Sequence, residues 1–456
     1  MKRMLACILS LMLACGLLAG CQSKPAEESG ESKDGTKPAA AAAEEKDGEE
    51  LPTITFYHHY YQDDAVDAKA MRALFDEFAE MHKDEFIFKP VPVEGDPEAV
   101  YNKCIQEIAS GSFPDIVETG GWNVVPAASE AGLIMDLKPY IDADPDFKAG
   151  VGVNYDQNLV DGKIYTVREQ LETMGFWYNE DLFNKAGADT PDKWQTWDDF
   201  VAAFDKLKAS PDVKTPVSLN QGWPTNIMFM AHLLGTQEGR DFIDTPLTTF
   251  DNDAFKGTVD FVAEHALSQI DTAYFGAADS ESYRDDFLNG DAAMLFNGVW
   301  EASSFVGDGL KIDPAVVKPA VFPTNENGKH AAIMSASCGY VISDKLSDAQ
   351  KEAAVAFVKY MCSPEVSERI FTEVLAMPAY LGLDYDQYIN DESADPVVRK
   401  LAEACKQCAQ ADYQTCAMSS LWGSDVEMEI GGKYAAMHDG SKTADQIVAE
   451  LDETLN

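Results

Sequence analysis

The sequence predicts an α/β protein with two domains. Short apolar strands alternate with amphipathic helices along most of the chain, a pattern typical of mostly parallel α/β sheets. With 456 residues, the chain is too long for one small core, which indicates two domains. Aromatic residues next to carboxylates and amides recur where predicted strands end. Because ligands of such sheets bind beyond the carboxyl ends of the strands, we expect a binding site there.

The charge balance disfavours two classes of partner. Lys and Arg number 35 against 78 Asp and Glu, a formal net charge of −43. Nucleic acids and anionic membrane surfaces both attract cationic protein surfaces, so we expect neither as an electrostatic partner. The acidity favours a solubilising surface, and an acidic cleft for a cationic ligand is the less supported alternative.

Residues 1–21 have the organisation of a bacterial lipoprotein signal peptide. Lys2 and Arg3 precede an apolar segment, Leu5–Leu18, that is too short for a stable membrane span. The following Ala19-Gly20-Cys21 completes a stretch that resembles a lipobox, which predicts a lipid at Cys21 and an extracytoplasmic protein anchored to the cell membrane. An ordinary signal peptide is the alternative. Residues 22–50 contain no aromatic residue, so we expect a disordered acidic linker.

The first half of the folded chain, from Leu51, follows a strand–helix repeat. Residues 57–61 and 118–122 follow the carboxyl ends of predicted strands, so we expect both segments to contribute to the site. Residues 136–150 contain alternating aspartates but lack the Gly and Glu of a calcium loop, so we expect a solvated loop. The predicted elements are strands at 53–57, 86–93, 115–117 and 163–167, and helices at 65–82 and 97–110.

Residues 175–200 should form an aromatic strand end supported by two capped helices. Asn179 is placed to cap the first helix, which Gly187 ends with a left-handed residue. Thr196 and Asp199 fit a capping box at the start of the second helix. Such an edge can form the wall of a binding cleft, although core packing could use the same residues.

The second half continues the alternation. A loop containing Trp223 precedes a helix, and a turn at Asn297-Gly298 places Trp300 and Glu301 beyond a strand end. The predicted elements are helices at 225–234, 254–267, 348–361 and 444–455, strands at 292–296 and 338–343, and an extended crossing at 317–323.

No familiar catalytic or cofactor motif occurs. The chain lacks a G-x-S-x-G elbow, an H-E-x-x-H motif, a P-loop and a G-x-G-x-x-G after a strand. Adjacent His58 and His59 would point to opposite faces of a strand, which disfavours joint metal binding. Cys405-x-x-Cys408 has no second such pair, so we expect buried or disulfide-bonded cysteines. We predict no enzyme, no metal and no cofactor, with a secreted hydrolase as the alternative.

Aromatic residues at strand ends favour a sugar ligand. Pyranoses have flat C–H faces that pack on aromatic rings, and hydroxyls that bond to carboxylates and amides. Any one aromatic residue could be a core residue, but several in both halves favour a site. The clearest are Trp122, Tyr178, Trp223, Trp300 and Trp422.

Several stretches, in family order, resemble the family 1 extracellular solute-binding proteins of bacterial ABC transporters, which include maltose-binding protein. Together they span nearly the whole mature chain. They are LAGC at Leu18, GSFPDIVETGGW at Gly111, the stretch GKIYTVREQLETMGFWYNEDLFNKAGADTPDKWQTWDDF at Gly162, FLNGDAAMLFNGVW at Phe287, GYVISDKLSDAQKEAAVAFVKYMCSPEVSERI at Gly339 and the terminal DGSKTADQIVAELDETLN.

The resemblance implies a type II periplasmic-binding-protein fold with a ligand cleft between two lobes and multiple hinge crossings. It implies a monomer that carries a mono- or oligosaccharide to an ABC permease by hinged closure, which requires tighter ligand binding in the closed form. The implied boundaries are 51–167 plus 318–372 for lobe I and 168–317 plus 373–456 for lobe II, with crossings near 167–171, 317–323 and 371–378.

The resemblance and the strand-end positions together give the expected ligand contacts. Tyr178 and Trp300 match aromatic positions that stack on sugars in carbohydrate-binding members, and Trp422 matches another position loosely. A receptor for another polar solute, such as a polyamine, is the alternative, and a structural or adhesive protein is a further one. Position in the predicted sheets gives the other expected contacts: Tyr57, His58, Glu118, Trp122, Trp223, Asn297, Glu301 and Cys338.

Overall fold

The structure is a computed structural model that separates into two compact units, residues 1–50 and 51–456. In the first unit, strands β1 (Glu45–Lys46) and β2 (Glu49–Glu50) pair antiparallel. The predicted signal peptide, Cys21 and most of the predicted linker lie outside the described residues. The structure describes residues 45–46, 49–62, 65–94, 97–118, 124–270, 282–305 and 310–455.

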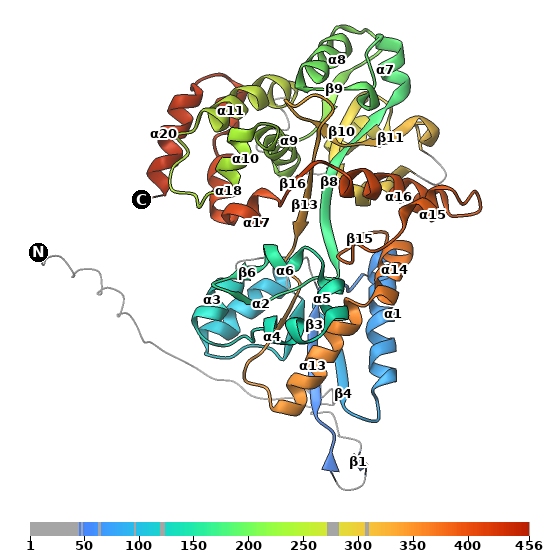
Figure 1. Cartoon of the computed structure of the whole chain (residues 1–456), viewed down its shortest axis with the longest axis vertical. Helices are drawn as coiled ribbons and strands as arrows, with labels where there is room; N and C mark the ends of the chain where they lie inside the picture. Colours follow the sequence, from blue (N-terminus) through green and yellow to red (C-terminus); the bar gives the residue numbers. More distant parts are fainter. Residues whose placement is uncertain are drawn as a thin grey trace, which may run out of the picture. The chain divides into compact units, whose positions relative to one another are not determined.

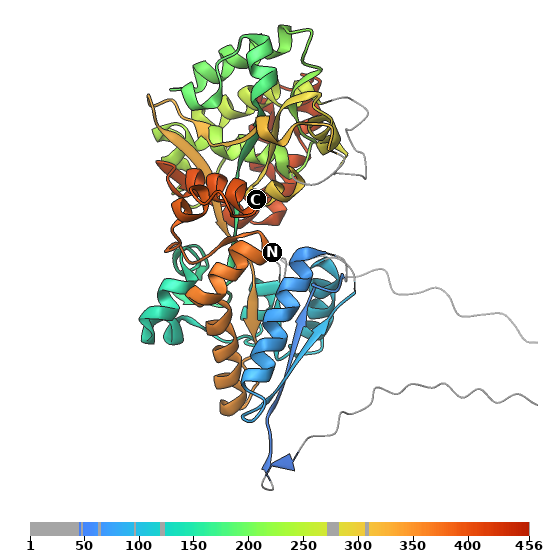
Figure 2. The same ribbon diagram turned by 90° about the vertical axis from the view of Figure 1, so that its right-hand side faces the viewer.

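The smaller sheet of the second unit has the strand order β14-β5-β3-β4. β3 (Thr53–His58) is parallel to β4 (Ile87–Pro92) and β5 (Ile116–Glu118), which confirms the predicted parallel repeat of the first half. β14 (Tyr340–Ile342) is antiparallel to β5. Ile54 and Phe56 of β3 pack with α1 (Val66–Met81) and α13 (Asp348–Met361), which lie side by side in Figure 2. Val117 of β5 packs with α2 (Pro97–Ala109) and α3 (Val124–Glu130).

The larger sheet is organised around one long strand, β8 (Gln170–Asn179), which runs away from the smaller sheet in Figure 1. The second half was expected to be mostly parallel, and this expectation is wrong because β8 runs opposite to four partners. These antiparallel partners are β10 (Ala292–Gly298), β11 (Val317–Ala320), β13 (His330–Ala336) and β15 (Met377–Pro378). The sheet is completed by β9 (Thr215–Ser218), β12 (Phe322–Pro323) and β16 (Tyr413–Thr415).

Helices bury both faces of the larger sheet. Successive strand residues point to opposite faces, so Phe176 packs with α8 (Trp197–Ala209), α9 (Trp223–Leu234) and α11 (Asp253–His265), whereas Trp177 packs with η3 (Val299–Phe305) and α16 (Pro396–Ala409). Further helices are α6 (Asn154–Gln157), α7 (Glu180–Ala186), α10 (Gln237–Ile243), α12 (Tyr283–Leu288), α14 (Pro364–Arg369), α15 (Tyr385–Ile389), α17 (Met418–Trp422), α18 (Ser424–Gly431), α19 (Tyr434–His438) and α20 (Ala444–Thr454).

The capping signals predicted in residues 175–200 are confirmed. The Asn179 side chain accepts hydrogen bonds at the start of α7, and Gly187 ends that helix with a φ of 64°. Asp199 Oδ2 accepts from the Thr196 backbone N at 3.1 Å and closes the capping box of α8. These helices hold the end of β8 in place.

The loop expected at residues 136–150 is wrong. Two short helices lie there, α4 (Lys138–Ala143) and α5 (Pro145–Val151). Asp144 Oδ1 accepts from the Asp146 backbone N at 3.0 Å, so this aspartate caps α5. One of the alternating aspartates is therefore a helix cap, and Pro145 at the first helical position supports this role.

In the described part of the chain, three connections pass between the two sheets, and they lie side by side. Val167 forms a bridge with Tyr340. The Ala379 backbone N donates to Glu169 O at 2.8 Å, just beyond the pairing of Met377 with Leu171. The connections therefore fall near 168–170, 337–339 and 375–376.

The crossing predicted at 317–323 is wrong, because these residues form β11 and β12 of the larger sheet. Residues 318–336 accordingly belong with the second lobe, not with lobe I as predicted. We propose lobe boundaries of 51–167 plus 340–374 for lobe I and 168–339 plus 375–455 for lobe II.

Gly175 gives a test of packing within the larger sheet. It lies in β8 opposite Asn297, and a Cβ there would lie 2.4 Å from the backbone oxygen of Ala320. A backbone atom in a paired strand cannot move away cheaply, so we expect Gly175→Ala to lower the free energy of unfolding by about 1–3 kcal/mol in denaturant titrations. The control is Gly257→Ala in α11, where no atom lies within 4 Å and alanine should stabilise the helix by up to about 1 kcal/mol. Equal effects of the two substitutions would contradict the prediction.

Candidate ligand-binding site

A cavity of about 500 Å³ lies where the connections pass between the sheets. Its volume is within the range of small-molecule sites, roughly 300–1,000 Å³. The smaller-sheet side contributes His59, Tyr60 and Asp67, the connections contribute Arg168, Gln170, Leu171, Glu172, Val374, Leu375, Ala376 and Met377, and the larger-sheet side contributes Met174, Trp223, Asn226, Ile227, Met230, Trp300, Ile333, Ala417, Met418, Ser419 and Glu427.

Two tryptophans form an aromatic corner of the cavity. Trp223 is the first residue of α9, and Trp300 lies in η3, just after β10. Their ring centroids are 6.0 Å apart and the rings are tilted by 49°. Both side chains are half-buried, so ring surface remains accessible from the cavity. Both residues were among the contacts expected from the sequence.

One face of α9 forms a continuous part of the cavity wall. Trp223, Asn226, Ile227 and Met230 have the spacing i, i+3, i+4, i+7 that places residues on one side of a helix. Sequence reasoning selected only Trp223, although the helical spacing could have found the other three.

A carboxylate is held against this face. Asn226 Nδ2 donates to Glu427 Oε1 at 2.6 Å, and the buried Tyr434 hydroxyl donates to Asn226 Oδ1. Burial raises the pKa of Glu427, which outweighs the lowering by its hydrogen bond to Asn226. The sequence contained no signal for Glu427, because it comes from α18, about 200 residues after α9.

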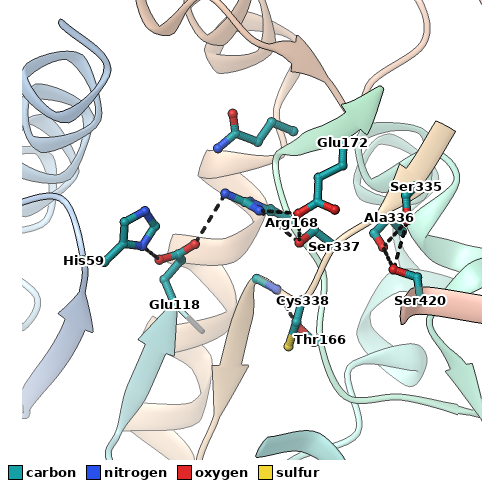
Figure 3. Close-up of polar contacts among 12 residues, drawn as sticks. His59, Glu118, Thr166, Arg168, Glu172, Ser335, Ala336, Ser337, Cys338 and Ser420 are labelled. Atoms are coloured by element: carbon teal, nitrogen blue, oxygen red, sulfur yellow. Dashed lines mark hydrogen bonds and ion pairs between the residues drawn. The ribbon is translucent and has the colours of Figure 1, made fainter. Parts of the chain in front are cut away.

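A buried ionic network lies at the connections (Figure 3). Glu118, which is 0% exposed, contacts His59 Nδ1 and lies 3.8 Å from Arg168 Nη2. Arg168 Nη1 donates to Ser337 Oγ at 3.0 Å, and Ser337 Oγ donates to Glu172 Oε1 at 2.8 Å. The network therefore joins β5 to two of the connections and ends in three cavity residues.

The charges in this network support one another. Burial raises the pKa of Glu118, but His59 and Arg168 outweigh it, so the carboxyl has a pKa below its usual value. Burial lowers the pKa of Arg168, and Tyr60 and Glu118 outweigh that effect, so its pKa is raised. Both groups are thus charged at neutral pH, and Glu118 fixes His59 and Arg168 at the cavity wall without lining the cavity itself.

The prediction of His58 as a ligand contact is wrong. Its side chain is 1% exposed, and its ring lies 5.0 Å from the ring of Phe75 and 5.3 Å from that of Phe56. Burial lowers the pKa of His58 to about 4. His58 is the last residue of β3, and the segment that follows the strand, His59 and Tyr60, lines the cavity instead.

Asn297 and Glu301 do not line the cavity but support the turn that carries Trp300. Asn297 Nδ2 donates to Glu301 Oε2 at 2.6 Å, and Arg284 Nη2 donates to Glu301 Oε1 at 2.6 Å. Both predicted contacts are 2% exposed. They therefore position an aromatic residue of the cavity without contacting its interior.

The structure places four other predicted contacts away from the cavity. Tyr178 lies four residues beyond Met174, or about 13 Å along β8, and packs on Phe183. Trp422 packs on Phe242, with ring centroids 5.7 Å apart. Tyr57 lies beneath Lys103 Nζ, which is 4.5 Å from its ring, and Cys338 is 0% exposed in the core of the smaller sheet. Trp122 lies outside the described residues.

Three further features concern metal ligands, membrane spans and cysteines. Within the described residues, no group of three or more His, Cys, Asp or Glu side chains is arranged to hold a metal ion. No helix in the described ranges combines the length and apolar character that a bilayer crossing requires. The cysteines of the second unit are not in disulfides, and all but Cys416 are buried: Cys104, Cys338, Cys362, Cys405 and Cys408.

Two α/β lobes joined by adjacent connections, with a partly aromatic cavity between their sheets, define a hinged binding protein of the type II periplasmic class. The family of bacterial extracellular solute-binding proteins matches residues 63–368, and the chain belongs to this family. Its members are the solute-binding components of ABC transporters rather than enzymes.

Individual relatives are similar over nearly the whole chain. A maltooligosaccharide ABC transporter solute-binding lipoprotein of Streptococcus pneumoniae is 24% identical over 98% of this chain and 96% of its own length. A solved S. pneumoniae solute-binding protein in complex with the blood group A-trisaccharide is 35% identical, with a TM-score of 0.75 over 88% of this chain and 99% of that one. A chitin oligosaccharide binding protein shares the fold at 24% identity, with a TM-score of 0.67 over 89% of this chain and 98% of that one.

Gly298 gives a test of the aromatic corner. A Cβ at Gly298 would lie 2.3 Å from carbon atoms of the Trp300 ring. Because this ring is a half-buried side chain, it can move aside, so we expect Gly298→Ala to displace it and to weaken ligand binding by about tenfold, a loss of about 1.4 kcal/mol. Isothermal titration with a glycan that binds the wild-type protein measures the effect, with Gly257→Ala as the control. Unchanged affinity would show that Trp300 does not contact the ligand.

Proposed function

We propose that this protein is an extracytoplasmic lipoprotein that binds an oligosaccharide between its two lobes and delivers it to an ABC import permease. The observation that carries the proposal is the corner of Trp223 and Trp300 beside hydrogen-bonding groups such as Glu427. Pyranose C–H faces pack on such rings, and sugar hydroxyls bond to carboxylates and amides. The protein acts as a monomer and without catalysis.

The relatives support a saccharide of more than one unit. The whole-length relative is described as a maltooligosaccharide-binding lipoprotein, and the solved relative at 35% identity holds a trisaccharide. A cavity of about 500 Å³ has room for such a ligand. The names of the relatives differ in the sugar, so they support the class of ligand and not one compound.

Both lobes contribute residues to the cavity, which explains why ligand binding favours closure. His59 belongs to the smaller-sheet side, and Trp300 belongs to the larger-sheet side. A ligand that contacts both gains contacts when the lobes approach, so its affinity is higher for the closed form and binding shifts the population toward closure. The permease then distinguishes loaded from empty protein.

A polyamine is the second candidate. Asp67, Glu172 and Glu427 give the cavity three carboxylates, against one guanidinium at Arg168. Glu172 already accepts from Ser337 and lies 3.6 Å from Arg168, so part of this acidity is neutralised within the protein. The aromatic corner therefore favours the sugar.

The Trp300→Ala variant tests the ligand class. Thermal unfolding is measured with mono- and oligosaccharides, polyamines and amino acids, and a ligand at 100 times its dissociation constant adds about 2.7 kcal/mol to stability. We expect an oligosaccharide to raise the midpoint of the wild-type protein and Trp300→Ala to abolish most of that shift. Trp422→Ala is the matched control, because this tryptophan packs outside the cavity: it should lower stability and keep the ligand shift. A shift with a polyamine and none with any sugar would reject the proposal.

The anchor is tested separately. Lipidation of Cys21 should retain the full-length protein in the membrane fraction of its host, whereas Cys21→Ser should release it into the soluble fraction or block its processing. Fractionation and intact mass measurement check both points. A wild-type protein of unlipidated mass in the soluble fraction would favour an ordinary signal peptide.

A further inference from the structure

We propose that the cavity selects sugars that carry an N-acetyl group, and that Glu427 and Met230 recognise this group on the sugar residue that packs on Trp223. The proposal rests on the proposed function, since it concerns the ligand of the same cavity.

Three kinds of group follow one another on this face. Helical rise places Asn226 about 4.5 Å and Met230 about 10.5 Å beyond Trp223 along the axis of α9. Asn226 holds the Glu427 carboxylate at 2.6 Å, so an aromatic ring, a carboxylate and a thioether line the wall in that order. This span is comparable to one pyranose ring with an equatorial substituent.

The carboxylate is oriented before any ligand binds. The fully buried Tyr434 hydroxyl donates to Asn226 Oδ1, which leaves Asn226 Nδ2 to donate to Glu427 Oε1. In its ionised form Glu427 only accepts hydrogen bonds, so this form selects a ligand that supplies an N–H or O–H donor. A position fixed in this way favours one donor geometry over others.

The Glu427 carboxylate is hydrogen-bonded by Asn226 and Ser419, and apolar side chains line the cavity on the same side. Ile227, Met230 and Met418 line the cavity and are each 2% exposed or less. A sugar hydroxyl directed at these three side chains, and not at Glu427, would lose water without gaining a hydrogen-bond partner, which costs roughly tenfold or more in affinity. A methyl group would gain contact with these side chains, and methionine adapts to such a group.

An acetamido group combines both requirements. Its N–H donates to a carboxylate, and its methyl group, held in the same plane, packs on apolar side chains. A hydroxyl supplies only the donor, and an ammonium group would have to lose its water beside the methionines. The other cavity carboxylates are less suited, because Glu172 is paired with the Arg168 guanidinium, with Nη1 and Oε1 3.6 Å apart, and Asp67 is on an exposed part of α1.

The test uses sets of ligands that differ only in the substituent at carbon 2, on one ring in the trisaccharides and on both rings in the disaccharides. Calorimetric titration of the full mature protein compares the blood group A- and B-trisaccharides and, separately, N,N′-diacetylchitobiose, cellobiose and the dimer of glucosamine. These sets present acetamido, hydroxyl and, in the last case, ammonium at the same ring position. We expect the acetamido ligand of a set to bind at least about tenfold more tightly than its hydroxyl counterpart. Equal or tighter binding of the hydroxyl form, or tightest binding of the ammonium form, would overturn the inference.

Two variants test whether Met230 and Glu427 are the residues that select the acetamido group. Met230→Gln and Glu427→Gln should each reduce the preference for acetamido over hydroxyl, with less effect on the hydroxyl ligand. Glu429→Gln, on the exposed side of α18, is the matched control and should change neither affinity. Because the readout is a ratio of two affinities of one protein, a loss of stability in a variant does not imitate the result. An unchanged ratio in both cavity variants would remove these residues from the proposal.

The outcomes separate this inference from the proposed function. If maltooligosaccharides or another hydroxyl-only glycan bind and the acetamido ligands do not, oligosaccharide binding stands and the N-acetyl selection is rejected. If no glycan binds and a polyamine does, both are rejected.

Discussion

The pairing of Glu118 with Arg168 and His59 is the interaction on which the arrangement of the two lobes depends. Glu118 is fully buried and the Arg168 side chain is 13% exposed, and removing Arg168 would leave an uncompensated buried carboxylate, which costs about 3–5 kcal/mol. Arg168 lies on one connection and contacts Ser337 on another, so the same guanidinium holds two crossing segments together. Its cavity-facing position also means that the hinge and the ligand share a residue. A ligand that bonds to Arg168 therefore acts directly on the segment about which the lobes move.

The cavity divides the work of recognition between its two sides. Ionic and hydrogen-bonding groups such as His59, Arg168 and Gln170 gather at the smaller sheet and the connections, whereas the larger-sheet side is mainly apolar and aromatic. A ligand with one hydroxyl-rich face and one face of C–H or methyl groups matches this division. The net charge of −43 contributes little to this division, because most of the carboxylates lie on the solvated surface.

The sequence was sufficient for the features that depend on nearby residues. Caps at Asn179 and Thr196 and the parallel repeat of the first half follow from local spacing, and the structure confirms them. Contacts between distant segments were not accessible in this way. From the sequence, Val317–Ala320 was predicted to be an extended crossing between the lobes. Its pairing with β8 shows that it is a strand of the larger sheet. His58 and His59 could not be told apart without knowing which side of β3 faces a helix.

The same limit applies to the site. Trp223 and Trp300 were found because each follows a turn, and large aromatic residues there stand out. Tyr178 was wrongly expected at the cavity. Its match to an aromatic position of the family does not show how far along β8 it lies from the ligand site. Glu427 was missed because its role depends on Asn226, a residue about 200 positions earlier that holds it in place.

The face of α9 has a consequence for how such receptors diversify. Trp223, Asn226, Ile227 and Met230 are side chains on one short helix, and none of them belongs to the buried ionic network at the connections. Substitutions on this face can therefore alter ligand specificity while the contacts between the connections stay the same. One helix, exchanged as a unit, is a practical starting point for converting this scaffold into sensors for different glycans.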